Sequence, residues 1–215
     1  MWALWSYRCV RANFDGALEI AEELIERSQV ASQDVALAAG LQARGTTLWH
    51  LGRLEDSAGA LESALEQVEG VDPEELERTG LTHMPILARC HTSHPFFLLG
   101  RAEEAERHVR RALAAADRQR DPFNHAISAM FAGWLAALGE DHAAAVHWLD
   151  DSVRICDEYG FRQLAAIATA PLGWAQAMNG DPGTGIPTLE GAIAAATEQG
   201  SLVLLRRAEE TLTAA

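Results

Sequence analysis

The stretch LWHLGRLEDSAGALESAL, residues 48–65, decides the fold of this chain. An apolar-periodic segment leads into Gly52, and a second periodic segment with small residues on one face follows it. Glycine adopts the left-handed backbone conformation that ends a helix, and small residues let the next helix pack back closely against the first. The stretch therefore predicts a helix, a tight turn and a second helix.

The same pattern recurs along the chain at intervals of about 40 residues, which indicates an internal repeat. Three stretches align with the first on a glycine: FFLLGRAEEAERHVRRAL around Gly100, LAALGEDHAAAVHWLDDS around Gly139 and QAMNGDPGTGIPTLEGAI around Gly180. A weaker copy, CVRANFDGALEIAEEL, places Ala12 at the same position. Residues Ala105, Val109 and Ala112 illustrate the small residues at i, i+4 and i+7 of a second helix.

Helix boundaries in the sequence support this division. Asp72-Pro73 and Asp121-Pro122 each place an N-cap acid before a proline at the first helical position. β-Branched residues never alternate over a useful length, so no strand is predicted. We expect an all-α fold of about eleven helices in a single domain, residues 1–215. Its repeats are predicted at roughly 1–30, 34–70, 73–118, 122–159 and 162–199, with a terminal helix at 201–213.

The order of Gly45, Leu48, Gly52, Leu61 and Ala64 resembles the tetratricopeptide repeat (TPR), as does Gly173 with Gly180, Leu189 and Ala192. The repeats here are near 40 residues long, where the family has about 34. Ser57 and Gly185 replace the family's usual alanine. The resemblance covers essentially the whole chain and implies a right-handed superhelical solenoid.

Two short strings resemble the TPR segments of large bacterial ATP-dependent LuxR-type transcriptional regulators. They are Gly173-Trp174 early in a first helix and EYGF, residues 158–161, after a second. This resemblance implies an ATPase module and a DNA-binding helix-turn-helix elsewhere in a parent protein. A chain that ends one helix into a sixth repeat favours an excised segment, although a capping helix would look the same.

Composition limits the function further. All 17 basic residues are arginine, which suggests a high-GC bacterial source and excludes a lysine Schiff base or a lysine-containing phosphate loop. The formal charge of −14 opposes binding to nucleic acid or to an anionic membrane. Three scattered cysteines, no signal peptide and no apolar span predict a soluble cytoplasmic protein.

The segment RCHTSHPFF, residues 89–97, raises the possibility of a metal site, because Cys90 and His94 share one helical face. Zinc needs three or four ligands, and no third ligand is in phase. His91 points about 100° away from Cys90. We therefore predict no metal and no cofactor. Pro95, inside the same helix, is expected to kink it, with either a change of groove curvature or local relief of packing as the result.

The TPR resemblance implies instead that Cys90 and His94 line the concave groove formed by the first helices. The full set predicted to line this groove is Gln42, Thr46, Trp49, Cys90, His94, Phe97 and Trp174. Trp148, on a second helix, is predicted to pack in the core. The chain is thus expected to be a non-enzymatic scaffold that binds a protein or peptide partner. The alternative is a receptor for a small metabolite, and self-association is left open.

Overall fold

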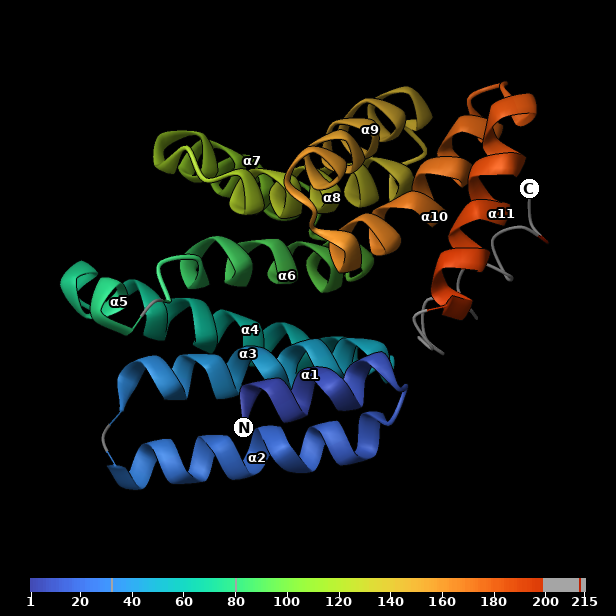
Figure 1. Ribbon diagram of the computed structural model, residues 1–215. Coiled ribbons are helices and arrows are strands. Elements are labelled where there is room, and N and C mark those ends of the chain that lie inside the picture. Colours follow the sequence, from blue (N-terminus) through green and yellow to red (C-terminus); the bar gives the residue numbers. More distant parts are fainter. Residues whose placement is uncertain (32, 80, 199–212, 214–215) are drawn as a thin grey trace. The chain divides into compact units, whose positions relative to one another are not determined.

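The computed structural model describes residues 1–31, 33–79, 81–198 and 213, and in these ranges it contains eleven α-helices and no strand (Figure 1). The helices are α1 Trp2–Val10, α2 Phe14–Ala31, α3 Asp34–His50, α4 Leu54–Glu69, α5 Pro73–Thr79, α6 Met84–Leu98, α7 Ala102–Gln119, α8 Pro122–Leu138, α9 His142–Tyr159, α10 Arg162–Met178 and α11 Pro182–Glu198. The predicted all-α fold is confirmed. The predicted terminal helix at 201–213 lies outside the described residues, apart from Thr213.

Ten of the described helices form five helix-turn-helix pairs, α1–α2, α3–α4, α6–α7, α8–α9 and α10–α11. The remaining one, α5, is an additional short helix between the second and third pairs. It begins after Asp72, whose carboxylate accepts a hydrogen bond from the backbone N–H of Glu74 (2.9 Å). The segment predicted as one repeat at 73–118 therefore holds three helices.

The turn inside each pair contains one residue in the left-handed conformation. These residues are Ala12 (φ 54°), Gly52 (73°), Gly100 (80°), Glu140 (61°) and Gly180 (91°). In the fourth pair the prediction is off by one residue, because Gly139 has φ −85° and the following glutamate takes the left-handed position. The period of about 40 residues is thus even, except between 52 and 100, where α5 is inserted.

A second feature recurs two helical turns before these positions, where the two helices of a pair come closest. A Cβ atom at Gly45 would lie 2.5 Å from Leu61 Cγ, one at Gly133 2.5 Å from Leu149 Cγ, and one at Gly173 2.9 Å from Leu189 N. Each leucine is completely buried. The close approach explains why glycine occupies these positions, because no other residue leaves room for the leucine.

The same crossings explain the two departures from the TPR pattern. The Ser57 hydroxyl donates a hydrogen bond to the Gly45 carbonyl (2.7 Å), so it ties α4 to α3. A Cβ atom at Gly185 would lie 2.4 Å from the Gly173 carbonyl oxygen, which excludes alanine there.

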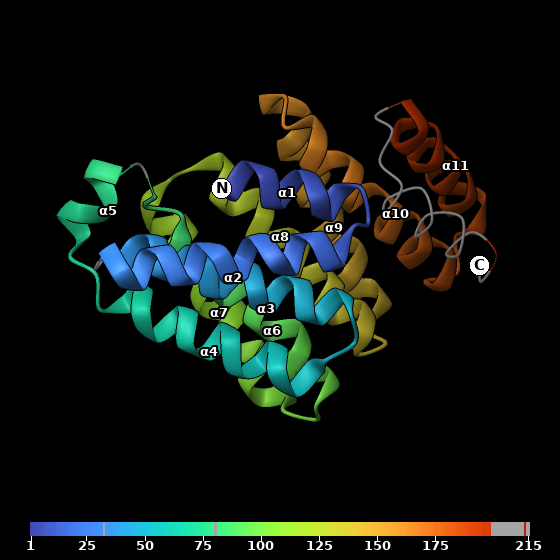
Figure 2. The same cartoon turned by 90° about the horizontal axis from the view of Figure 1, so that it is seen from below.

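The helices form two compact units, Met1–Ala112 and Leu113–Ala215, with the boundary inside α7. In the first unit, α1 lies alongside α2 and α3 (Figures 1 and 2), and Trp5 packs with Ala17, Ile20 and Ala43. In the second unit, Leu189 packs with residues of α10 and α11. The single domain expected for residues 1–215 stays a prediction. Within the described ranges, no helix is long and apolar enough to cross a membrane.

Candidate functional site

The first helices of the second and third pairs carry most of the predicted groove residues at the same i, i+4, i+7 spacing. These residues are Gln42, Thr46 and Trp49 on α3, and Cys90, His94 and Phe97 on α6. Side chains at this spacing share one helix face. The structure brings two of them together across the helices: the ring centroids of Trp49 and His94 are 5.3 Å apart, with an interplanar angle of 33°.

Burial divides this set into two groups. The exposed fractions of the smaller polar members are 0 % for Gln42, 0 % for Cys90, 2 % for His94 and 6 % for Thr46. Trp49 and Phe97 are half-buried, so part of each ring faces solvent. Of this set, the two aromatic residues are therefore the ones most accessible to a partner from solution.

The enclosed Gln42 amide is poorly satisfied. Its Nε2 lies 3.4 Å from His91 Nδ1, and the same Nδ1 lies 2.9 Å from the Leu87 carbonyl oxygen. A carbonyl can only accept, so Nδ1 carries the proton and cannot accept one from Gln42. Gln42 Oε1 has no hydrogen-bond partner in the described part of the chain, and neither has Thr46 Oγ1, one turn further along α3. An unsatisfied buried polar group costs about 1–3 kcal/mol.

His91 is the site residue that sequence reasoning missed. Burial of its ring lowers the pKa of His91 to about 4, against a smaller opposing effect of the bond to Leu87. The ring is therefore neutral at ordinary pH. Its angular separation from Cys90 was the reason to exclude it from a shared metal site. The same orientation brings its ring close to Gln42 of α3. Helical spacing along α6 contains no information on that contact between two helices.

The thiols of this chain give little support to metal or nucleophilic chemistry. Burial raises the pKa of Cys9 and of Cys156 to about 11, so both remain protonated. Among the described residues, no group of three or more His, Cys, Asp or Glu side chains could hold a metal ion. The absence of a bound metal stays a prediction.

The structure keeps α6 helical through Pro95. Proline has no N–H, so the His91 carbonyl loses its regular helical donor. In the turns before it, the Thr92 hydroxyl donates to the Ala88 carbonyl (2.8 Å) and the Ser93 hydroxyl to the Cys90 carbonyl (2.7 Å). Such back-bonding is typical of bent helices. The predicted kink remains untested.

The last predicted groove residue, Trp174, belongs to the other unit. It lies half-buried on α10, where its ring meets His142 of α9 edge-on at 5.2 Å. Trp148, predicted to lie in the core, is also half-buried, and its ring lies 4.9 Å from that of His147.

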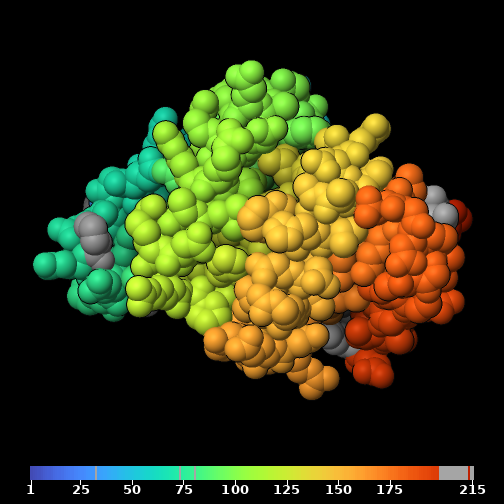
Figure 3. Space-filling model, turned by 90° about the horizontal axis from the view of Figure 1, so that it is seen from above, coloured from blue at the N-terminus to red at the C-terminus, as the bar shows by residue number. Residues whose placement is uncertain are grey.

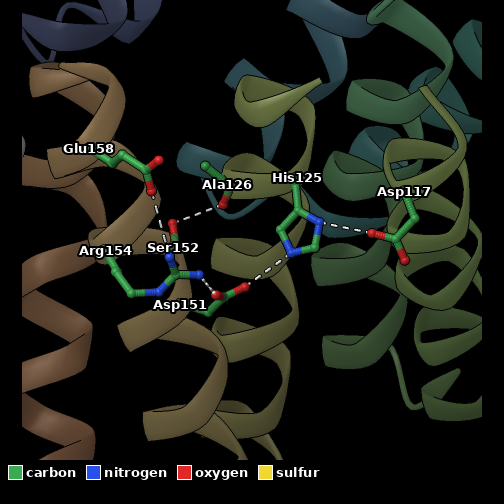
Figure 4. Close-up of polar contacts among 7 residues, drawn as sticks. All are labelled: Asp117, His125, Ala126, Asp151, Ser152, Arg154 and Glu158. Atoms are coloured by element: carbon green, nitrogen blue, oxygen red, sulfur yellow. Dashed lines mark hydrogen bonds and ion pairs between the residues drawn. The ribbon is translucent and has the colours of Figure 1, made fainter. Parts of the chain in front are cut away.

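The C-terminal unit contains a polar network centred on His125 of α8 (Figure 4). His125 Nδ1 lies 2.9 Å from Asp117 Oδ1 of α7, and Nε2 lies 3.0 Å from Asp151 Oδ2 of α9. Asp151 also contacts Arg154, which in turn lies 3.8 Å from Glu158. A neutral imidazole donates one hydrogen bond and an imidazolium two, so the protonated ring satisfies both carboxylates.

This network ties helices together and is poorly arranged for catalysis. Burial opposes the ionisation of Asp151, but the hydrogen bonds from Arg154 and His125 outweigh it, so the pKa of Asp151 lies below its usual value. The neighbouring Ser152 is completely buried and donates its hydroxyl to the Ala126 carbonyl (2.8 Å). That hydroxyl is therefore not positioned as a nucleophile for His125.

Comparison with known proteins supports the fold and leaves the function open. No protein-family model and no curated protein matches the sequence. Among solved structures, a Rap protein complexed with competence and sporulation factor matches 98 % of this chain with a TM-score of 0.74 and 16 % identity. The match covers 62 % of the Rap chain, so the present chain spans about three fifths of that protein.

Two further structures are similar. BtubC from P. vanneervenii matches 92 % of this chain and 78 % of its own, with a TM-score of 0.62 and 17 % identity. A putative kinesin light chain from Podosopora anserina with nearly identical TPR-like repeats matches 93 % of this chain and 94 % of its own, with a TM-score of 0.59 and 13 % identity. At such identities the likeness concerns the fold alone, and the fold is TPR-like.

Proposed function

We propose that this chain is a non-enzymatic binding scaffold that holds a peptide or protein partner on the face formed by its first helices. Trp49 and Phe97 provide the accessible contacts in the N-terminal unit, with His94 packed behind Trp49. Trp174 provides the contact in the C-terminal unit. The wider context is a segment of a bacterial transcriptional regulator.

One observation carries this proposal: on the face of α3 that bears the half-buried Trp49, the buried Gln42 Oε1 and Thr46 Oγ1 have no hydrogen-bond partner in the described part of the chain. Aromatic side chains contribute much of the binding energy at interfaces. The Gln42 amide can both donate to and accept from a peptide group, and Thr46 offers a hydroxyl beside it. The solved structure of the Rap protein in complex with its factor supports the use of this fold for binding.

The second candidate is a small polar metabolite, for which the unsatisfied amide oxygen of Gln42 and the hydroxyl of Thr46 would be the polar partners. Pockets for small ligands cover most of the ligand surface and use few polar groups. A peptide would instead remain accessible along much of its length. The two candidates therefore differ in whether a long ligand can bind.

The test is a selection of binders from a displayed library of random peptides, followed by affinity measurements with substituted chains. Trp49→Ala is expected to weaken the affinity for the selected peptides by at least about tenfold, which corresponds to about 1.4 kcal/mol. Gln42→Leu is expected to weaken binding while raising the melting temperature, because it removes an unsatisfied buried amide. A library that yields no binder, together with a saturable metabolite, would favour the second candidate.

Trp148→Ala is the control for both variants, because Trp148 is also half-buried but lies on the second helix of its pair. It should lower the melting temperature and leave affinity unchanged. If Trp148→Ala abolishes binding in a folded chain while Trp49→Ala does not, the binding face is formed by the second helices. The regulator context has its own test, since an ATPase motif upstream and a helix-turn-helix downstream in the parent gene are expected.

A further inference from the structure

The α6–α7 hairpin of the N-terminal unit is aligned by a contact between Phe96 and His108. Their ring centroids are 5.4 Å apart and their planes are perpendicular, at 89°. The Arg101 guanidinium lies 3.6 Å from the centroid of the same phenylalanine ring. Because the two helices run antiparallel, residues before Phe96 on α6 face residues after His108 on α7.

This alignment gathers arginines around His108. Arg107 and Arg111, one helical turn apart on α7, flank the histidine, and Arg89 lies two turns before Phe96 on the same face of α6. Arg107 and Arg111 are exposed on α7, which is coloured green to yellow-green in Figure 3. The cluster is unusual in a chain with a formal charge of −14.

The carboxylates nearby neutralise only part of this charge, because they pair with two of the three arginines. Glu104 is held by Arg101 at 2.8 Å and reaches Arg107 only at 3.5 Å, while Glu62 contacts Arg101 at 2.9 Å. Arg89 pairs with Glu69. In the part of the chain that the structure describes, no carboxylate lies within ion-pair distance of Arg111. The uncompensated positive charge of the cluster is therefore that of Arg111.

The ionisation of neighbouring groups reflects this charge. Burial and the positive charge of Arg111 lower the pKa of Arg89. Burial lowers the pKa of His108 to about 4, and the charges of Arg89, Arg107 and Arg111 add to this effect, against a smaller opposing effect of Glu104. His108 is thus neutral, and its Nδ1 is buried with no hydrogen-bond partner among the described residues.

We infer that Arg89, Arg107 and Arg111 form a binding site for an oxyanion, a phosphate or a carboxylate group, with His108 at its rim. Guanidinium groups recognise such oxygens through paired N–H donors. A bound oxyanion would offset the repulsion between Arg89 and Arg111, and would favour protonation of His108 beside it. The site is independent of the proposed partner-binding face.

Titration of the full chain with inorganic phosphate, followed through the His108 ring resonances by NMR, tests this inference. A saturable shift and a rise in the pKa of His108 are expected, and sodium chloride at matched ionic strength should produce neither. A parallel titration with malonate distinguishes the two oxyanions. Saturation by malonate alone would support the same site as a carboxylate site.

Arg111→Gln and Arg110→Gln are the matched pair of variants. Arg110 is adjacent in sequence but lies about 100° around α7 from Arg111, on the side away from His108, and it pairs with Glu106 at 2.9 Å. Arg111→Gln should weaken the affinity for the anion by about tenfold or more, and Arg110→Gln should weaken it by no more than about twofold. Equal losses in both variants, or no saturable shift with either anion, would overturn the inference. In the free Arg111→Gln chain, the pKa of His108 should rise, which confirms the cluster independently of binding.

Discussion

At the scale of single residues, burial decides what the polar side chains of this chain can do. Cys90 and His94 have the spacing of a metal-binding pair, and the sequence places them correctly on one face of α6. The structure shows that this face is covered, with His94 against the Trp49 ring at 5.3 Å. His91, expected to point elsewhere, reaches Gln42 on α3. Periodicity predicts a face but not the residues opposite it.

The neutral, half-buried His91 makes the fold sensitive to acid. Its pKa is about 4 in the folded chain and 6.5 when unperturbed, so the unfolded chain binds the proton first. The stability contribution is therefore complete above pH 6.5 and is lost as the pH falls toward 4. Between pH 7 and pH 5 the free energy of unfolding should fall by about 2 kcal/mol from this group.

Urea denaturation at the two pH values measures this fall, and His91→Gln should reduce it by a similar amount. An identical pH dependence in the variant and the original chain would show that His91 is accessible to protons in the fold.

At the scale of helices, the repeat is specified by a small number of contacts. A left-handed residue ends each first helix, and a glycine two turns earlier in α3, α8 and α10 admits a buried leucine of the second helix. The sequence predicted the pairs because these residues recur at a fixed period. It misplaced the fourth turn by one residue, because glycine is the usual residue in the left-handed conformation, whereas here Glu140 adopts it and Gly139 does not. It predicted a helix start at Pro73 but missed that this helix ends at Thr79 and that a separate helix begins at Met84, because seven residues are too few to show periodicity.

The close contact between α3 and α4 can be tested with two glycines. Gly45→Ala places a methyl group 2.5 Å from Leu61 Cγ and should destabilise the chain by about 1–3 kcal/mol. Gly59→Ala is the control, because a Cβ atom there meets nothing within 4 Å. In the middle of α4 that change should stabilise by about 0.5–1 kcal/mol. Thermal unfolding measures both, and a stable Gly45→Ala chain would contradict the described crossing.

The His125 network predicts a second effect at the scale of helices. His125→Ala removes the contacts that join α8 to Asp117 and Asp151, and leaves Asp151 paired with Arg154 alone. We expect a loss of about 1–2 kcal/mol in the free energy of unfolding. Asp150→Asn, an exposed neighbour outside the network, should change it by less than about 0.5 kcal/mol. Equal effects would show that the network contributes no stability.

At the scale of the whole molecule, fold and function differ in how far the sequence can predict them. The fold depends on local periodicity and recurs five times, so an error at one turn changes little. A binding site depends on interactions between residues far apart in the sequence, such as the contact of Gln42 with His91 or the charge repulsion between Arg89 and Arg111. Nothing in the spacing of either helix indicates these contacts. The groove predicted from these residues therefore stays a prediction, and four of its seven residues are buried.

The net charge acts over the whole chain. It should allow the binding of a single oxyanion but oppose the binding of a nucleic acid. The proposed oxyanion site needs only three guanidinium groups close together. A DNA duplex carries a charge about every 1.7 Å along its axis, so it would meet the acidic remainder of a chain with net charge −14. A fluorescent duplex should therefore show no anisotropy change with the chain at about 50 mM salt, where electrostatic attraction is strong. Binding that weakens as salt increases would instead show that the arginines dominate the field around the molecule.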